Sequence, residues 1–489
     1  MNEFLTKFDD SLNPILVKDL RQIVRGKFIW GVLLLLLGII VLILGISLLE
    51  AGTSIRGDIN GEFISYAMSA LLFFACGLII PIQIGRKTSE EVNDATHELI
   101  FTTTMTSSSI VKGKILSGTV TIIMLYATVA PFLSLTLYMG GVDIKNLFVA
   151  MVYSFIVSHV AVLFQVNAGM SYRSEAVIAS IGHKAGIIIS HIIGWFFAAS
   201  IGSMILSGDL LRRSGTADFW TYTITFIISV IFISIIFYML TVSRIQTESS
   251  NRTYFLKFVT SVIWCIGSLL CSFDKEFSLG WTAAVFIALI PLSVFLLLDP
   301  ENYSRRVLSE IPKNPIGRVL AYPFYTGMLN SYVWIVITGI LTLFYSMRYY
   351  SGSHRNDFFS FLACVITMLI SSHSYFFISN FIKNMLFKDK SRTYIFNIFA
   401  TIVAIVVIGS FIAENLIYPY HSGWASLLSP FSMCYFVNGD NIIVCIIATL
   451  VIWGISLILN INRIGAQLIT YFDPESKLKE DYMITQNKG

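Results

Sequence analysis

The chain has 489 residues, of which 55% are hydrophobic and only 13% are charged, and its formal net charge is +4. Together with a mean hydropathy of +0.75, this composition excludes a soluble globular protein, which would carry about twice as much charge. It also argues against nucleic-acid binding, which needs clustered basic surface. The six cysteines have neither the spacing of a zinc site nor that of a redox CxxC pair, so no metal site is expected.

Residues 1–27 are predicted to contain an amphipathic helix that lies in the membrane interface. Asn13 suits the N-cap and Pro14 suits the first helical position. The following residues separate into an apolar face and a basic face, which hold Leu16, Leu20, Ile23 and Val24, and Lys18, Arg21 and Arg25 respectively. Acidic lipid head groups attract such a helix. An ordinary basic flank of a membrane span that happens to be helical is the alternative interpretation.

Twelve apolar stretches approach the roughly 20 residues that a membrane-crossing helix needs. They lie at 28–49, 63–84, 115–138, 146–168, 185–206, 220–241, 258–273, 279–298, 328–349, 358–379, 394–413 and 441–460. The stretch at 258–273 is the shortest. Most of the 33 Lys and Arg fall in loops that face the cytoplasm if residues 1–27 do, which predicts that both ends are cytoplasmic.

The predicted fold is therefore an all-α, polytopic transmembrane helix bundle in a bacterial-type inner membrane. We expect a first unit of six helices at 28–241, a second unit of six helices at 242–460, and a cytoplasmic tail at 461–489.

The loop at 85–114, between the second and third predicted spans, is longer than a helical hairpin requires. Its run Thr88-Ser89-Glu90-Glu91 has the form of a capping box, which predicts that the Thr88 hydroxyl meets the backbone amide of Glu91. A short helix is expected through 98–101. The hydroxyl-rich run at 102–109 favours a break before the third span, because such side chains compete for backbone hydrogen bonds.

This loop and the segment before the first span resemble the type-2 permeases of ATP-binding-cassette (ABC) transporters. The family loop commonly reads Glu, Gly-Thr-x-Glu-Leu-Leu, Thr-Pro-Leu-Ser, Ile and Gly-Lys, and this chain has matching residues in Glu91, Thr96, Glu98, Leu99, Thr102, Thr103, Ile110, Gly113 and Lys114. The run Asn13-Pro14-x-Leu16-x-Lys18-Asp19-Leu20-Arg21 is similar to the family's elbow helix. Ala95 replaces the usual glycine and Thr104 the usual proline. The specific resemblance covers residues 13–120.

The resemblance implies a permease subunit that exports a substrate, or handles lipid or peptide, and is driven by a separate ABC ATPase docked under 88–104. The chain itself has no Walker A motif, because Ser108 stands five residues before Gly113, where that motif has a glycine. We therefore expect no catalytic residue and no cofactor in this chain, since the partner subunit uses the ATP. Membrane lipids are expected partners, and a second permease subunit or a homodimer is compatible with the pattern.

Two other classes of function stay open, namely an ion-coupled secondary transporter and a membrane scaffold or assembly factor that transports nothing. None of the 29 Asp and Glu falls inside a predicted span, whereas ion-coupled carriers usually bury a carboxylate near the midplane. His159, His191 and His373 do fall inside spans. We interpret them as neutral imidazoles hydrogen-bonded between helices, and a functional site is the alternative.

Overall fold

The computed structural model describes residues 13–53, 61–93, 105–138, 144–170, 217–246, 250–270, 275–297, 303–349, 355–388, 394–395, 398–399, 401–403, 405–406 and 441–474. The chain divides into two compact units, Met1–Ile245 (unit 1) and Gln246–Gly489 (unit 2). All regular elements within the described ranges are helices, and those ranges contain no strand. The all-α prediction is therefore confirmed for this part of the chain.

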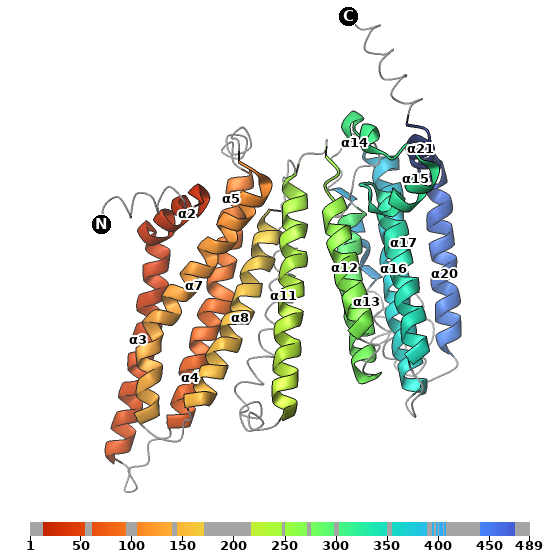
Figure 1. Ribbon diagram of the computed structural model, residues 1–489. Helices are drawn as coiled ribbons and strands as arrows, with labels where there is room; N and C mark the ends of the chain where they lie inside the picture. Colours follow the sequence, from red (N-terminus) through yellow and green to blue (C-terminus); the bar gives the residue numbers. More distant parts are fainter. Residues whose placement is uncertain are drawn as a thin grey trace, which may run out of the picture. The chain divides into compact units, whose positions relative to one another are not determined.

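Unit 1 is built from long helices that run side by side (Figure 1). Its elements are α2 (Pro14–Arg25), α3 (Lys27–Thr53), α4 (Gly61–Phe74), the π-helical turn η1 (Ala75–Ile79), α5 (Ile80–Asn93), α7 (Ser107–Tyr138), α8 (Ile144–Gly169) and α11 (Ala217–Ile245). α4, η1 and α5 follow one another without a break and form one continuous rod. The short helix α2 lies at the end of unit 1 where α5 stops and α7 begins.

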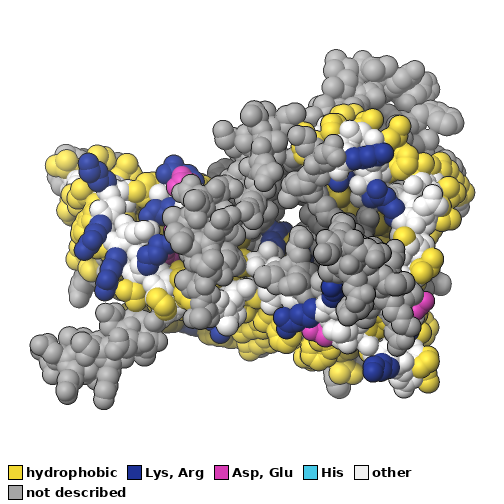
Figure 2. Space-filling view, turned by 90° about the horizontal axis from the view of Figure 1, so that it is seen from above, with side chains coloured by type: hydrophobic (Ala, Val, Ile, Leu, Met, Phe, Trp, Pro, Cys, Tyr) yellow, Lys and Arg dark blue, Asp and Glu magenta, His cyan; other side chains and the backbone are white. Residues whose placement is uncertain are grey.

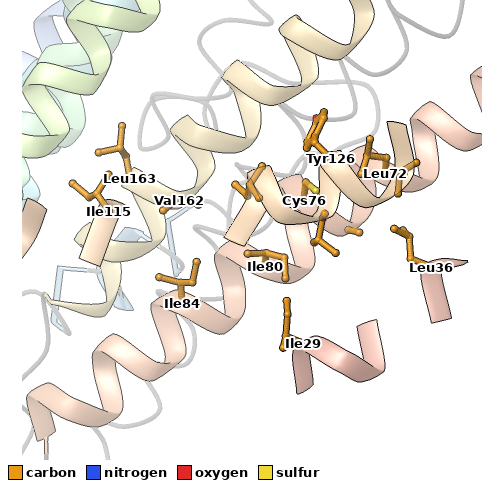
Figure 3. Close-up of a cluster of buried hydrophobic side chains, with 14 of the residues drawn as sticks. Ile29, Leu36, Leu72, Cys76, Ile80, Ile84, Ile115, Tyr126, Val162 and Leu163 are labelled. Atoms are coloured by element: carbon orange, nitrogen blue, oxygen red, sulfur yellow. The ribbon is translucent and has the colours of Figure 1, made fainter. Parts of the chain in front are cut away.

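One apolar cluster holds the helices of unit 1 together. Its buried side chains come from α2, α3, the α4–α5 rod, α7, α8 and α11, and Figure 3 shows several of them converging, including Leu36, Cys76, Ile80 and Val162. The outward side chains are also apolar, as in α3, where Leu34, Leu42 and Leu49 are exposed. A helix that is apolar on all sides suits hydrocarbon on its outer face rather than water.

Unit 2 combines long helices with several short ones. Its elements are α12 (Tyr254–Leu270), α13 (Lys275–Leu296), α14 (Arg305–Glu310), α15 (Pro315–Ala321), the 3₁₀ turn η3 (Tyr322–Phe324), α16 (Met328–Tyr349), α17 (Arg355–Leu386), α20 (Asn441–Leu459) and α21 (Ile461–Phe472). α13 packs on α16 and α17, and α17 packs on α20. The short helices α14, α15 and α21 lie together at one end of this unit (Figure 1).

Six helices within the described ranges are long and apolar enough to cross a membrane: Lys27–Leu49, Ile64–Glu91, Ser107–Leu137, Leu147–Gly169, Phe226–Ile245 and Met328–Tyr345. The pair α20 and α21, bent by 63°, adds a seventh if both are counted as one span. The protein is thus a membrane-embedded, multi-pass protein. The predicted spans at 258–273, 279–298 and 358–379 coincide with α12, α13 and α17, which are not among the six. The stretch at 185–206 and most of 394–413 lie outside the described residues, so twelve spans and cytoplasmic ends stay predictions.

The capping box predicted at Thr88 is wrong. Thr88 lies inside α5, and its Oγ1 donates a hydrogen bond to the backbone oxygen of Ile84 at 2.8 Å. The second long helix continues without interruption to Asn93, so the backbone amide of Glu91 lies in the last turn of a helix and not in a first turn. The box pattern matched in sequence, but no helix starts at this point.

The loop predicted at 85–114 is correspondingly too long. α5 occupies its first part, and α7 begins at Ser107, so Ser107, Ser108 and Ser109 are helical rather than part of a break. Thr106 acts as the cap instead, because its Oγ1 accepts a hydrogen bond from the backbone amide of Ser109 at 3.2 Å. Only 94–106 connects the two helices.

Two boundaries in unit 2 also differ from the sequence prediction. The helix expected at 258–273 runs from Tyr254 to Leu270, and its start includes Lys257, whose buried ammonium donates to the backbone oxygen of Tyr325 at 2.6 Å. The predicted tail at 461–489 begins with helix α21, in which Tyr471 is fully buried. Hydropathy alone does not predict these boundaries, because it does not show which polar residues are hydrogen-bonded inside the protein.

Candidate functional site

Asn13 both starts α2 and attaches it to α7. Its Oδ1 accepts a hydrogen bond from the backbone amide of Ile15 at 3.0 Å, which satisfies one free amide of the first turn. Its Nδ2 donates to the backbone oxygen of Ser109 at 2.6 Å and lies 3.2 Å from the Ser109 hydroxyl. The predicted N-cap is confirmed, and the same side chain fixes the helix to the first turn of α7.

Gly113 allows the two helices to approach closely. A Cβ atom at this position would lie 2.9 Å from Cβ of Ile15 and 3.0 Å from Oδ1 of Asn13. Ile15 and Ile110 are buried beside it, in the apolar cluster of unit 1. The glycine that the family resemblance singled out therefore has a packing reason, which is contact between α2 and α7.

A cluster of four charged side chains lies next to this contact, and we call it the junction cluster: Lys18, Asp19, Glu91 and Lys114. Nζ of Lys114 lies 2.9 Å from Oδ2 of Asp19 and 2.6 Å from Oε2 of Glu91. Nζ of Lys18 lies 3.2 Å from Oε1 of Glu91. The Lys114 and Asp19 side chains are only 6% and 7% exposed, whereas Lys18 is 42% exposed. Two ammonium groups and two carboxylates make the cluster neutral overall.

Lys114 is the central group of the junction cluster. It comes from α7 and contacts one carboxylate from α2 and one from the end of α5, so it joins three helices. Burial raises the pKa of Asp19 above its ordinary value, because desolvation outweighs the attraction of the Lys114 ammonium. Removing one member of a buried ion pair leaves the other charge without compensation, so the cluster depends on Lys114 being present.

The structure brings together five of the residues that the sequence singled out, at the contact between α2, α5 and α7: Lys18, Glu91, Ile110, Gly113 and Lys114. Leu16 in α2 is buried as well. Of the other predicted residues of α2, Leu20 is half-buried, and Arg21 and Arg25 are exposed. Thr96, Glu98, Leu99, Thr102 and Thr103 lie outside the described residues.

The predicted apolar face of α2 needs correction. Val24 was expected on that face but is exposed, whereas the buried side chains are Ile15, Leu16 and Asp19. The face that packs on α7 thus contains a carboxylate, which a search for apolar periodicity misses. The available signal was Asp19 itself, four residues after Ile15 and so on the same face of the helix. Ser108, which bonds Tyr238 of α11 at 2.6 Å, had no signal in the sequence.

The intramembrane histidines differ from one another. Nδ1 of His159 in α8 lies 2.9 Å from the Thr119 hydroxyl in α7, which agrees with the predicted hydrogen bond between helices. Nδ1 of His373 instead lies 2.5 Å from the backbone oxygen of Leu369 in its own helix, so the interhelical bond predicted for it is not formed through that atom. His191 lies outside the described residues.

Comparison of the chain with models of protein families, with curated proteins and with solved structures finds no match. We therefore infer a function from the junction cluster and from the motif that contains its residues.

Proposed function

We propose that this chain is the membrane permease subunit of an ABC transporter, and that a separate ATPase docks on the segment 94–106, which we call the docking segment. The junction cluster carries the proposal, because it joins both helices that flank this segment to α2. On this proposal the cluster end of unit 1 faces the cytoplasm, where ATP is available. The substrate is one that is exported, or a lipid or peptide.

Force applied to the docking segment would reach several helices at once. Glu91 lies two residues before the end of α5, and Lys114 lies in the second turn of α7. Their ion pair links the two flanking helices across the segment, and the Lys114–Asp19 pair adds α2 to the same body. Closure of an ATPase bound to the docking segment would therefore move α2, α5 and α7 together. Such a rigid-body movement can switch the side of the membrane from which a substrate site is accessible.

The first turn of α7 is also connected to α11 by a side-chain hydrogen bond. The Ser108 hydroxyl lies 2.6 Å from the Tyr238 hydroxyl of α11. This bond is partly buried, and side-chain hydrogen bonds between helices help to fix their relative position. Movement of the α7 end would thus be felt by α11, the last helix of unit 1.

Charge and shape changes in the docking segment test the proposal. We expect the double variant Glu98→Lys with Leu99→Asp to insert in the membrane normally but to lose the ATPase that co-purifies with the tagged parent chain. The measurement is nucleotide hydrolysis by the purified complex, together with identification of a Walker A protein in it by mass spectrometry. A matched control is Asp218→Lys with Phe219→Asp, an acidic and apolar pair predicted to face the opposite side of the membrane.

The outcome separates the proposed function from its alternatives. Loss of hydrolysis in the Glu98 and Leu99 variant, but not in the control, supports docking. Normal recovery of the ATPase with the double variant contradicts the docking segment. Transport that stops when the proton gradient is removed, but continues when ATP is exhausted, would instead indicate an ion-coupled secondary transporter.

A further inference from the structure

α15 in unit 2 has an apolar face without a protein partner among the described residues. Ile316, Val319 and Leu320 are 70%, 60% and 69% exposed. Their spacing of three and four residues places them on one side of the helix. No side chain of α15 itself is buried, so packing inside the protein does not account for these three large apolar residues.

α21 has a similar exposed face. Ile461, Ile469 and Phe472 are exposed, whereas Gln467 and Tyr471 are buried. The buried side contacts α16, because Oε1 of Gln467 accepts a hydrogen bond from the backbone amide of Leu329 at 3.1 Å. α21 is therefore held on unit 2 by one face and presents apolar side chains on the other.

The two helices form one body, which we call the apolar platform (α15 and α21). The Tyr471 hydroxyl donates to the backbone oxygen of Arg318 at 3.0 Å, and Nη1 of Arg318 donates to the backbone oxygen of Phe472 at 2.6 Å. The rings of Tyr322 and Phe472 stack with centroids 5.6 Å apart. Two short helices that come from distant parts of the chain are thus fixed to each other.

The chain connections place the apolar platform where long apolar helices end. α15 leads through η3 directly into α16, one of the six helices that can cross a membrane, and α21 follows α20 after a bend of 63°. Amphipathic helices beside a membrane lie at the boundary between head groups and acyl chains, and α15 and α21 each expose an apolar face. Apolar side chains exposed at that depth contact lipid rather than water.

The charge around the apolar platform is mainly positive. The described residues of α14, α15, α21 and their flanks contribute five basic side chains (Arg305, Arg306, Lys313, Arg318 and Arg463) and two acidic ones (Glu310 and Asp473). Figure 2, which looks onto this end, shows Lys and Arg side chains among apolar ones on unit 2. A basic rim beside an apolar face complements a membrane that contains acidic lipids.

We propose that the apolar platform is a membrane-interface anchor that inserts Ile316, Val319, Leu320, Ile469 and Phe472 between the lipid head groups and binds acidic phospholipid through its basic rim. This inference does not depend on the ABC permease assignment. The occupant is the lipid surface of the membrane in which the protein resides.

Depth measurements test this proposal in the full-length chain. An environment-sensitive fluorophore is attached through a non-natural amino acid at position 320 or 469, which leaves the native cysteines in place. The protein is reconstituted in vesicles of phosphatidylethanolamine and phosphatidylglycerol. Nitroxide lipids labelled near the head group are then compared with lipids labelled deep in the acyl chain. Position 309, an exposed serine in α14, is the matched control for a probe in water.

We expect shallow nitroxides to quench the probes at 320 and 469 more strongly than deep ones, and neither to quench the probe at 309. Iodide in the water should quench the probe at 309 more strongly than the probes at 320 and 469. The variant Ile316→Asp with Val319→Asp should expose the probe at 320 to iodide, while the thermal unfolding midpoint stays close to that of the parent, because both side chains are largely exposed in the folded protein.

Two results would overturn the anchor, and a third would overturn its preference for acidic lipid. Probes at 320 and 469 that iodide reaches as easily as the probe at 309 would place the platform in water. Protection that disappears when the protein-to-lipid ratio is lowered would assign the face to a second copy of the chain. Equal shallow quenching after phosphatidylglycerol is replaced by phosphatidylcholine would overturn the preference for acidic lipid.

Discussion

α2 in unit 1 and α15 in unit 2 start with the same three residues and have different surroundings. Each begins with Asn-Pro-Ile, and in each the Asn side chain accepts a hydrogen bond from the backbone amide of the Ile, at 3.0 Å for Asn13 and 3.2 Å for Asn314. Yet Ile15 is 6% exposed and Ile316 is 70% exposed. The same cap therefore starts two helices, and the isoleucine after the proline is buried in α2 but exposed in α15.

The comparison shows that a cap fixes where a helix begins but not what its faces contact. α2 faces Gly113, which permits close approach, and Lys114, which neutralises Asp19. α15 is held mainly through the backbone oxygen and guanidinium of Arg318, on the side that faces α21. Its apolar side chains are left for another environment, which we propose to be lipid.

The largest effect is expected from Lys114→Met. The change removes the ammonium from between Asp19 and Glu91, and breaking a buried ion pair in this way costs about 3–5 kcal/mol of the free energy of unfolding. Denaturant unfolding of the detergent-solubilised protein measures it. The neutral triple variant, which adds Asp19→Asn and Glu91→Gln, should recover most of the loss. A loss below about 1 kcal/mol, as for a surface pair, would mean that the junction cluster is solvated.

Replacing a glycine by alanine tests one close contact inside each unit, at Gly113 in unit 1 and at Gly327 in unit 2, through the free energy of unfolding. Gly327→Ala is expected to cost more than Gly113→Ala, because φ is +135° at Gly327, which adds about 1–3 kcal/mol of backbone strain, and the new Cβ would also overlap Gln467. Gly113→Ala should cost less, about 1–3 kcal/mol, because only the packing against Ile15 is overfilled. Gly38→Ala in α3 is the control, since its Cβ meets nothing within 4 Å. Equal unfolding midpoints for all three would contradict both contacts.

Removal of each helix cap compares α2 and α15 directly. Asn314→Ala should cost about 1 kcal/mol, the usual value for a lost N-cap. Asn13→Ala should cost roughly 1–2 kcal/mol, because it also removes the hydrogen bond from the Asn13 amide to the Ser109 backbone oxygen. Asp at either position preserves the cap and serves as the control. If the two Ala variants unfold alike, the Asn13–Ser109 bond contributes little to the attachment of α2.

The smallest effect is expected from pH. Since burial raises the pKa of Asp19, the folded protein binds this proton more tightly than the unfolded chain does, and the contribution of Asp19 to stability falls as pH rises from the ordinary Asp value of 3.8 through the folded pKa. Asp19→Asn should remove this part of the dependence. Unfolding midpoints of the parent and the variant across that pH range provide the measurement, and parallel curves would contradict the raised pKa.

Several elements were predictable from sequence because their causes are local. The start of α2 follows from the cap chemistry of Asn13 and Pro14, and the long helices follow from apolar runs. The Thr88 capping box failed because a four-residue pattern does not reveal whether the preceding helix has ended. The sequence places α21 in a tail after the last apolar run, and it does not show that Gln467 and Tyr471 are satisfied by partners in α16 and α15.

By itself, the sequence determined that this protein is helical, embedded in a membrane and capped at Asn13, because hydropathy and helix caps depend on neighbours in the chain. Only the tertiary structure decided that Asp19, Glu91 and Lys114 meet in a neutral buried cluster, and that α15 joins α21. Those contacts connect residues on different helices, and the free energy of a buried charge depends on which opposite charge lies within about 4 Å of it.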